Sequence, residues 1–276
     1  MVDRGSGVPL VLIPGVQGRW EWMVPTVDAL SRTHRVLAYS LCGEPGSGCP
    51  QPVVFDDLVE QVDRVLDQAG VEAAVCCGVS FGGWIALRYA AQRTPRVLGL
   101  VLVSTPSPAW RPDARLKRIL SAPWRAAPAF LIGGALRMRA EVRIALPGLR
   151  GRAAYLVRQL PRIARAPMWP PRAAARMRLG LEVDLVSDRD RIRVPTLVVS
   201  GEPGLDKVVP VSETKEYARR IPGATYARLD RTGHLGLVTH AERFAALVTN
   251  FTAQVGDRER ARARPIALRG EPSRRP

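Results

Sequence analysis

The chain of 276 residues contains little histidine, lysine or cysteine, and it has no long uncharged run of apolar residues. Without about 18 consecutive apolar residues, no membrane-spanning helix is expected. The apolar stretch from Ala126 to Leu136 is too short and too rich in glycine and proline to cross a bilayer. The first residues, Met-Val-Asp-Arg-Gly, lack the basic-then-apolar layout of a secretory signal. We therefore expect a cytoplasmic protein without a transmembrane segment.

The four cysteines are Cys42, Cys49, Cys76 and Cys77. In a reducing compartment they are expected to be free thiols. Cys76 and Cys77 are adjacent, which is not a metal-binding spacing, and no cluster of histidine and cysteine indicates a metal site. Cys42 and Cys49 lie across a glycine-rich loop, so a disulfide between them is the alternative. Neither a metal nor another cofactor is expected.

The formal net charge is +16, and it is unevenly distributed. Residues 107–182 contain 16 basic and 3 acidic side chains, residues 256–276 contain 7 and 3, and the rest of the chain is nearly neutral. No helix-turn-helix, zinc-finger or RNA-recognition pattern accompanies this charge, so a nucleic-acid partner is not expected. A solvated arginine surface is the simplest interpretation. Attraction of an anionic substrate, an anionic membrane surface or an acidic carrier protein is the alternative.

Short apolar segments alternate with helical patterns over the first hundred residues. Strands are predicted at residues 8–13, 35–39, 73–79 and 97–104, and helices at residues 22–31, 55–69 and 82–92. Each strand is apolar throughout, which indicates burial on both faces of the sheet. Strands of this kind that alternate with helices are typical of a parallel sheet covered by helices on both sides.

The alternation stops after residue 105. Residues 106–186 are rich in arginine, alanine and proline, and strand patterns return at 194–200 and 225–229, with helices predicted at 212–220 and 241–253. We therefore predict an α/β fold with a mostly parallel sheet of six to seven strands. Its domains are a core of residues 1–105 and 187–255, a helical cap insertion of residues 106–186 and a basic, disordered tail of residues 256–276.

Ser80 lies in the segment Gly78-Val79-Ser80-Phe81-Gly82, between a predicted strand and a predicted helix. Small residues on both sides permit a sharp strand-to-helix turn that exposes the serine hydroxyl. The pattern predicts Ser80 as a nucleophile, with the backbone N–H of Phe81 stabilising an oxyanion at the start of the helix. The alternative is an ordinary strand-to-helix turn with a capping serine.

A serine nucleophile needs a histidine base, and the chain has three histidines. His34 precedes a predicted strand and His240 opens the last helix, whereas His234 follows the last strand in a loop flanked by glycines. His234 is therefore the predicted base. The carboxylate that orients it is predicted to be Asp206, with Glu202 in the same loop as the alternative.

A second oxyanion donor is expected in the loop after the first strand, Pro14-Gly15-Val16-Gln17-Gly18, where we predict the backbone N–H of Val16. With this loop, the chain resembles the α/β-hydrolase superfamily, especially its small esterases, lactonases and perhydrolases. The matching segments are Leu10 to Gly15, Gly78 to Gly83, Asp206 to Pro210 and Gly233-His234, in that order. They cover roughly residues 5–105 and 190–252.

The resemblance has three departures. Family members often carry His-Gly where this chain has Pro14-Gly15. The loop from Ser40 to Gly46 lacks the Asp and Arg of the usual Asp-x-Arg-Gly-x-Gly. The N-terminus is too short for the leading hairpin of many members.

The resemblance implies a serine hydrolase that cleaves an ester, lactone or thioester through an acyl-enzyme on Ser80. The same residues would also suit a perhydrolase, C–C hydrolase, lyase or acyltransferase, and a non-catalytic binding protein is a further alternative. The expected partner is a small-molecule acyl ester, anionic or carrier-bound. The protein itself is expected to be a monomer or a homodimer. The cap offers apolar pocket candidates, which could equally form its own small core: Trp110, Trp124, Phe130, Met138 and Trp169.

Overall fold

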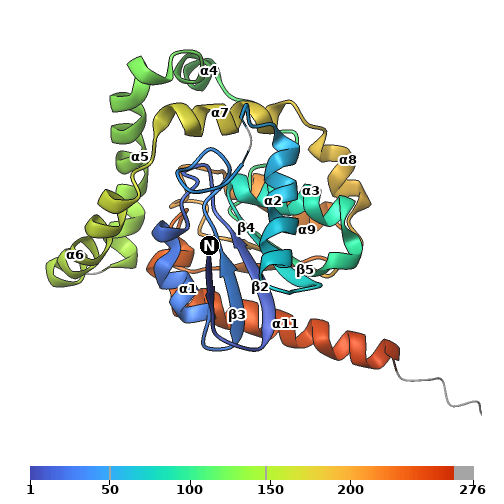
Figure 1. The fold of residues 1–276 in the computed structure, drawn as a ribbon. Coiled ribbons are helices and arrows are strands. Elements are labelled where there is room, and N and C mark those ends of the chain that lie inside the picture. Colours follow the sequence, from blue (N-terminus) through green and yellow to red (C-terminus); the bar gives the residue numbers. More distant parts are fainter. Residues whose placement is uncertain (50, 147, 264–276) are drawn as a thin grey trace, which may run out of the picture.

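A computed structural model describes residues 1–49, 51–146 and 148–263, which are built around one central sheet (Figure 1). In this part of the chain the sheet has seven strands in the order β1-β3-β2-β4-β5-β6-β7. Only β1 is antiparallel to its neighbour, and every other pair is parallel. The strands are β1 (Val2–Arg4), β2 (Val8–Ile13), β3 (His34–Ala38), β4 (Ala74–Val79), β5 (Val97–Val103), β6 (Thr196–Ser200) and β7 (Thr225–Arg228).

Helices cover both faces of the sheet, because alternate residues of each strand point to opposite sides. One face packs on α2 (Phe55–Gln68), α3 (Phe81–Gln92), α8 (Leu185–Arg191) and α9 (Val211–Arg220). The other packs on α1 (Val24–Leu30), α10 (Gly236–Thr239) and α11 (Ala241–Ala263). The predicted α/β class, with a mostly parallel sheet of six to seven strands, is confirmed.

Five helices lie between β5 and β6 in the described residues, and four of them arch over one end of the sheet (Figure 1). These four are α4 (Ala114–Ser121), α5 (Pro123–Ala145), α6 (Leu149–Arg165) and α7 (Pro170–Leu181). We refer to α4–α7 as the cap. Two short 3-10 helices, η1 (Trp20–Met23) and η2 (Thr94–Arg96), complete the elements. α6 packs against η1, and α8, which follows the cap, packs against α3 of the core.

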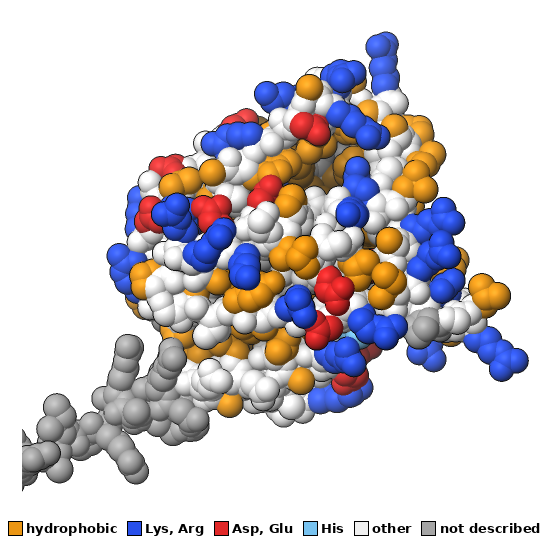
Figure 2. All heavy atoms as spheres, turned by 180° about the vertical axis from the view of Figure 1, so that it is seen from behind, with side chains coloured by type: hydrophobic (Ala, Val, Ile, Leu, Met, Phe, Trp, Pro, Cys, Tyr) orange, Lys and Arg blue, Asp and Glu red, His pale blue; other side chains and the backbone are white. Residues whose placement is uncertain are grey.

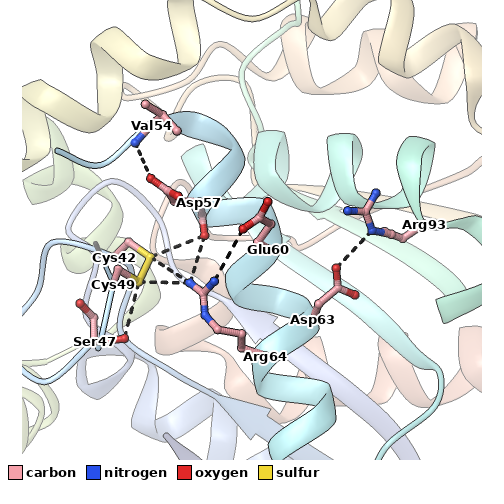
Figure 3. A network of polar contacts seen from close by, with 9 residues as sticks. All are labelled: Cys42, Ser47, Cys49, Val54, Asp57, Glu60, Asp63, Arg64 and Arg93. Carbon is pink, nitrogen blue, oxygen red and sulfur yellow. Dashed lines mark hydrogen bonds and ion pairs between the residues drawn. A yellow bond between two sulfur atoms is a disulfide. The ribbon is translucent and has the colours of Figure 1, made fainter. Parts of the chain in front are cut away.

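Cys42 and Cys49 form a disulfide, with their Cα atoms 5.3 Å apart (Figure 3). The expectation of free thiols is therefore wrong for this pair. Gly43, Gly46 and Gly48 all adopt positive φ, which folds the short loop back so that its ends meet. The Arg64 guanidinium of α2 lies 3.4 Å from the Cys49 sulfur (Figure 3). Cys76 and Cys77 are free and buried in β4, as expected.

The C-terminal helix is longer than the sequence pattern predicts. α11 continues to Ala263, so residues 256–263, which we expected in a disordered tail, are helical. The rest of that segment lies outside the described residues. Among the residues that the structure describes, no helix has both the length and the apolar character needed to cross a membrane.

Candidate active site

Ser80 occupies the turn between β4 and α3 with φ 53° and ψ −120°. A positive φ is unfavourable for a serine, so the surrounding structure must hold it there. The backbone N–H of Ser80 donates to the carbonyl of Val103 (2.8 Å), and its carbonyl accepts from the N–H of Gly83 (2.9 Å). These two bonds fix the turn to β5 on one side and to the first turn of α3 on the other.

The glycines on either side of Ser80 are required by close backbone contact. A Cβ on Gly78 would collide with the backbone of Gly82 and Gly83. A Cβ on Gly82 would collide with the carbonyls of Ile13 and Pro14 at the end of β2. The sequence pattern is therefore a packing requirement that brings α3, β4 and the loop after β2 together.

The loop after β2 lies directly beside the serine. A Cβ built on Gly15 would be 3.4 Å from the Cβ of Ser80, so the peptide that follows, which carries the N–H of Val16, adjoins the serine. Phe81 is the first residue of α3, where backbone N–H groups have no partner within the helix. Both expected oxyanion donors thus adjoin Ser80.

His234 and Asp206 contact each other in the loops that follow β7 and β6. His234 Nδ1 lies 3.2 Å from Asp206 Oδ2. The other carboxylate oxygen of Asp206 accepts the backbone N–H groups of Val208 (3.0 Å) and Val209 (2.9 Å). Burial alone would raise the pKa of Asp206, but the bonds from His234 and the two N–H groups outweigh it, so the pKa is lowered. The carboxylate is therefore held ionised.

The competing residues are engaged elsewhere. Glu202 accepts the backbone N–H of Arg231 through Oε1 (2.8 Å). His34 is buried as the first residue of β3, with Nε2 2.9 Å from Oγ1 of Thr252. His240 ends α10. The geometry therefore pairs His234 with Asp206.

A cavity of about 1680 Å³ lies between the sheet domain and the cap. Ser80, Asp206 and His234 all line it, so the structure brings the three predicted residues to one cavity. Most of the remaining lining is apolar, and it comes from both the cap and the sheet domain. The lining also includes six exposed cations: Arg111, Arg115, Arg137, Lys207, Lys215 and Arg228.

The predicted pocket residues divide into two groups. Trp110, Phe130 and Met138 line the cavity. Trp124 and Trp169 do not, and the prediction is wrong for them. They pack edge-to-face on each other with ring centroids 4.7 Å apart, and 62% and 42% of their surfaces are exposed. Trp124 is the second residue of α5 and Trp169 precedes α7, so the two meet at helix ends outside the lining.

Several lining residues were not predicted from the sequence. They follow helical spacing within α4, α5, α6 and α7, which is the one sequence signal that could have identified them. These residues are Leu116, Ile119, Val142, Tyr155, Leu160, Ile163 and Met177.

Glu141 is a fully buried carboxylate that sequence reasoning missed. It comes from α5, and both its oxygens accept the backbone N–H of Leu235, at 2.9 and 3.0 Å. Burial raises the pKa of Glu141, although the N–H groups of Leu235 and Gly233 oppose this. Leu235 directly follows His234, so a side chain of the cap holds the histidine loop.

The cap also contacts the oxyanion loop, through Arg176 of α7. Its guanidinium donates to the carbonyl of Val16 (3.1 Å) and the carbonyl of Cys42 (3.2 Å), and pairs with Glu44 (2.6 Å). Both charged groups are buried. Gly18 has φ +76°, and a Cβ there would collide with the Arg176 guanidinium. The loop from Ser40 to Gly46 lacks the Asp and Arg that family members usually have there. It is held instead by the ion pair between its own Glu44 and Arg176 of the cap.

Comparison with known proteins gives a consistent picture. The sequence model of the alpha/beta hydrolase family matches residues 10–247. The 2-hydroxymuconate semialdehyde hydrolase of Pseudomonas putida is 31% identical, with 91% of this chain and 89% of that protein covered. A pimeloyl–acyl-carrier-protein methyl ester esterase of Aromatoleum aromaticum is 30% identical, with 83% and 90% covered.

Among solved structures, an esterase from Exiguobacterium antarcticum superimposes with a TM-score of 0.74 at 18% identity, covering 91% of this chain and 94% of that one. At that identity the likeness shows the fold alone. The family match extends over the strained serine turn, the His234–Asp206 pair and the segments that carry them. The chain therefore belongs to the alpha/beta hydrolase family.

Proposed function

We propose that this protein is a serine hydrolase that cleaves an ester-type bond of a small acyl substrate through an acyl-enzyme on Ser80. The observation that carries the proposal is the strained, positive-φ turn at Ser80, facing the same cavity as the hydrogen-bonded pair His234 and Asp206. A hydrolase of this family needs a nucleophile, a base and a group that orients the base. These three residues supply them.

In the proposed reaction His234 takes the proton of the Ser80 hydroxyl through Nε2 as the serine oxygen attacks the substrate carbonyl carbon. Asp206 accepts the hydrogen bond of His234 Nδ1 and stabilises the imidazolium. The N–H groups of Phe81 and Val16 donate to the oxyanion. His234 then protonates the leaving alcohol or thiol, activates a water molecule and returns the proton to Ser80 as the acyl group leaves as an acid.

The cavity supports an acyl substrate with an apolar portion. Its lining from the cap is largely aliphatic and aromatic, and the cations around it favour a substrate with an anionic group. The methyl ester esterase similar to this chain supports an ester as the bond cleaved. In this proposal residues 106–186 act as a cap that shapes the acyl pocket over a catalytic core of residues 1–105 and 187–255.

A second candidate keeps the same three residues but cleaves another carbonyl compound. It is favoured by the similarity to a semialdehyde hydrolase, whose name does not denote an esterase. Product analysis of a panel of esters, lactones, thioesters and C–C-cleavage substrates would decide between the two. Ester hydrolysis at a rate far above the other reactions supports the first candidate.

The nucleophile can be tested with a fluorophosphonate probe, which labels activated serines. We expect the wild-type protein to be labelled at Ser80, and Ser80→Ala to remain unlabelled with a loss on the order of 10⁶ in kcat. Equal labelling of both proteins would refute the proposal.

The identity of the carboxylate that orients His234 can be tested by comparing Asp206→Asn with Glu202→Gln. Asp206→Asn should lose about 10⁴ in kcat because the histidine tautomer is no longer fixed. Glu202→Gln should keep most of the activity. A large loss confined to Glu202→Gln would reverse the assignment.

A further inference from the structure

Exposed apolar side chains are concentrated on the cap. The part of the chain that the structure describes has sixteen large apolar residues with exposed side chains, and eleven of them lie between Trp124 and Trp169. A monomeric protein rarely exposes so many apolar groups in one region without an interaction partner. The cap is therefore the part of the molecule in which to look for an interaction surface.

Helix α6 carries the clearest pattern. On a helical projection five apolar residues fall within one third of its circumference. Of these, Leu149 is 81% exposed and Val157 is 71% exposed. The other three are Leu156, Leu160 and Ile163. We call these five residues the α6 face.

The side of α6 that packs on the core adjoins one edge of the α6 face, next to Ile163. Gln159 is buried and its amide donates to the carbonyl of Trp22 in η1 (3.5 Å). Tyr155, one turn earlier, packs with the core cluster below α1. The contacts that hold the helix thus lie beside the α6 face and leave Leu149 and Val157 largely exposed.

Arginines continue round the helix from the Val157 edge of the α6 face, with Arg150 next to that edge and Arg158 and Arg165 further round. Arg150, Arg158 and Arg165 of α6 are all exposed. In the described residues, the ion pairs made by the basic side chains of the cap are those of Arg172 and Arg176 with Glu44. Figure 2 shows Lys and Arg side chains interspersed with apolar ones over the cap and around the hollow. The combination of an apolar stripe and unneutralised arginines is typical of helices that lie in a lipid interface.

We propose that the α6 face docks on an anionic lipid bilayer, with the five apolar side chains inserted between headgroups and the arginines paired with lipid phosphates. The charge decides against a second copy of this chain as the occupant, because two faces that belong to segments of net +13 would repel each other. The exposed aliphatic side chains favour a bilayer over an acidic protein, which the arginines alone would attract.

The docked orientation would connect the bilayer to the cavity. Leu156, Leu160 and Ile163 belong both to the α6 face and to the cavity lining. An acyl chain leaving the bilayer along α6 would therefore stay in apolar contact until it reaches the cavity that contains Ser80. This last step rests on the proposed hydrolase function, whereas bilayer binding does not.

The experiment is co-sedimentation of the full chain with vesicles. We expect binding to vesicles of equal parts phosphatidylglycerol and phosphatidylcholine, little binding to phosphatidylcholine alone, and weakening at high salt. Arg150→Ser/Arg158→Ser should bind about 25-fold more weakly, since each arginine near an anionic surface contributes about a fivefold factor. Leu149→Ser/Val157→Ser should weaken binding about tenfold through lost apolar insertion. None of these four residues lines the cavity.

Two matched variants control for charge and apolar surface elsewhere. Arg219→Ser/Arg220→Ser removes two cations from α9, and Val54→Ser/Val186→Ser removes two exposed valines that lie outside α4–α7. Both should bind like wild type. Equal losses in a control and its α6 counterpart would overturn the proposal, as would wild-type binding by both α6 variants.

Two further outcomes separate the alternatives. If the wild type ignores vesicles but binds poly-glutamate in a way that depends on Arg150 and Arg158, the surface recognises an acidic protein and the bilayer proposal is wrong. Hydrolysis of a short water-soluble ester is measured in parallel. If wild type binds vesicles as expected but neither it nor any variant hydrolyses the ester, the proposed hydrolase function is refuted, whereas the proposed docking surface is supported.

Discussion

Asp206 is held by three hydrogen bonds, of which only one comes from His234. The two backbone N–H groups of Val208 and Val209 remain when the histidine is neutral or displaced. Together with the hydrogen bond and the charge interaction from His234, they outweigh the burial of Asp206 and lower its pKa. The carboxylate thus contributes to the stability of the loop as well as to the orientation of the histidine.

A pH dependence of stability follows from this lowered pKa. A carboxyl group whose folded pKa lies below its unfolded value of about 4 adds stability above that value and loses it as the pH falls through the folded pKa. We expect wild type to exceed Asp206→Asn in free energy of unfolding at neutral pH, and the difference to shrink below about pH 4. Urea denaturation of both proteins across this range measures it. A difference that does not change with pH would contradict the hydrogen-bond assignment.

At the level of single residues, the sequence predicts those whose neighbours are local. Ser80 is surrounded by glycines that are close in sequence, and Asp206 and His234 each follow a recognisable strand. Glu141 could not be found this way, because its partner Leu235 is 94 residues away and nothing near Glu141 marks it as buried. Trp124 and Trp169 failed for the related reason that composition does not tell which way a helix is rotated.

Among the elements, α5 has a role beyond lining the cavity, because Glu141 ties it to the histidine loop. We expect Glu141→Ala to lower kcat about tenfold or more, since the N–H of Leu235 loses its acceptor and His234 shifts with it. Glu141→Gln should keep most of the activity because an amide oxygen can still accept. Steady-state kinetics, with thermal unfolding recorded for each variant, provides the measurement.

A control in the same helix is Arg139→Ala, an exposed residue outside the cavity lining. It should leave kcat unchanged. If Glu141→Ala and Glu141→Gln both keep the wild-type kcat while only the melting temperature falls, Glu141 is a structural contact of the cap and does not position His234.

The loop between β3 and α2 is the second element with a testable consequence. Closing so short a loop by the Cys42–Cys49 disulfide should stabilise the fold by roughly 2 kcal/mol. Addition of a reductant is therefore expected to lower the urea midpoint of wild type. Cys49→Ser should have the same midpoint as reduced wild type, whether or not reductant is present. Burial raises the pKa of the Cys76 and Cys77 thiols and keeps them inert, so they should not contribute.

Considered as elements, the sheet and its flanking helices could be read from the sequence because their apolar periodicity is a local property. The disulfide could not be predicted in this way, since the pairing of Cys42 with Cys49 depends on the positive φ of three glycines in the loop between them. The extension of α11 to Ala263 was missed because charged residues such as Arg258 and Glu259 carry no apolar period, although they are compatible with a helix.

On the scale of the whole molecule, the size of the cavity predicts a preference for long acyl groups. Gly134 of α5 lines the cavity, and a Cβ there would meet nothing within 4 Å, so a larger side chain would project into free space. We expect Gly134→Phe to reduce the hydrolysis of long-chain p-nitrophenyl esters by about tenfold relative to short ones. Measuring kcat/KM against chain length tests this.

The neighbouring residue offers a matched control. Gly133 does not line the cavity, and a Cβ on it would approach only the ends of the Arg137 and Arg115 side chains. Gly133→Phe carries the same change of helix propensity and should leave the chain-length profile unaltered. If both variants shift the profile equally, the cavity below α5 is not the acyl site.

The contact of Arg176 with the loops below it has a consequence for evolution within the family. Gly18, Glu44 and Arg176 lie far apart along the chain, yet Arg176 is acceptable only opposite a glycine at position 18, and Arg176 and Glu44 are each acceptable only with the other. Arg176 occupies the space that a side chain at position 18 would need, and removal of either buried charge would strand the other. Substitutions at these positions should therefore be epistatic. Related chains that carry a larger residue at the position of Gly18 should have lost the arginine and the glutamate together, a covariation that an alignment of the family would reveal.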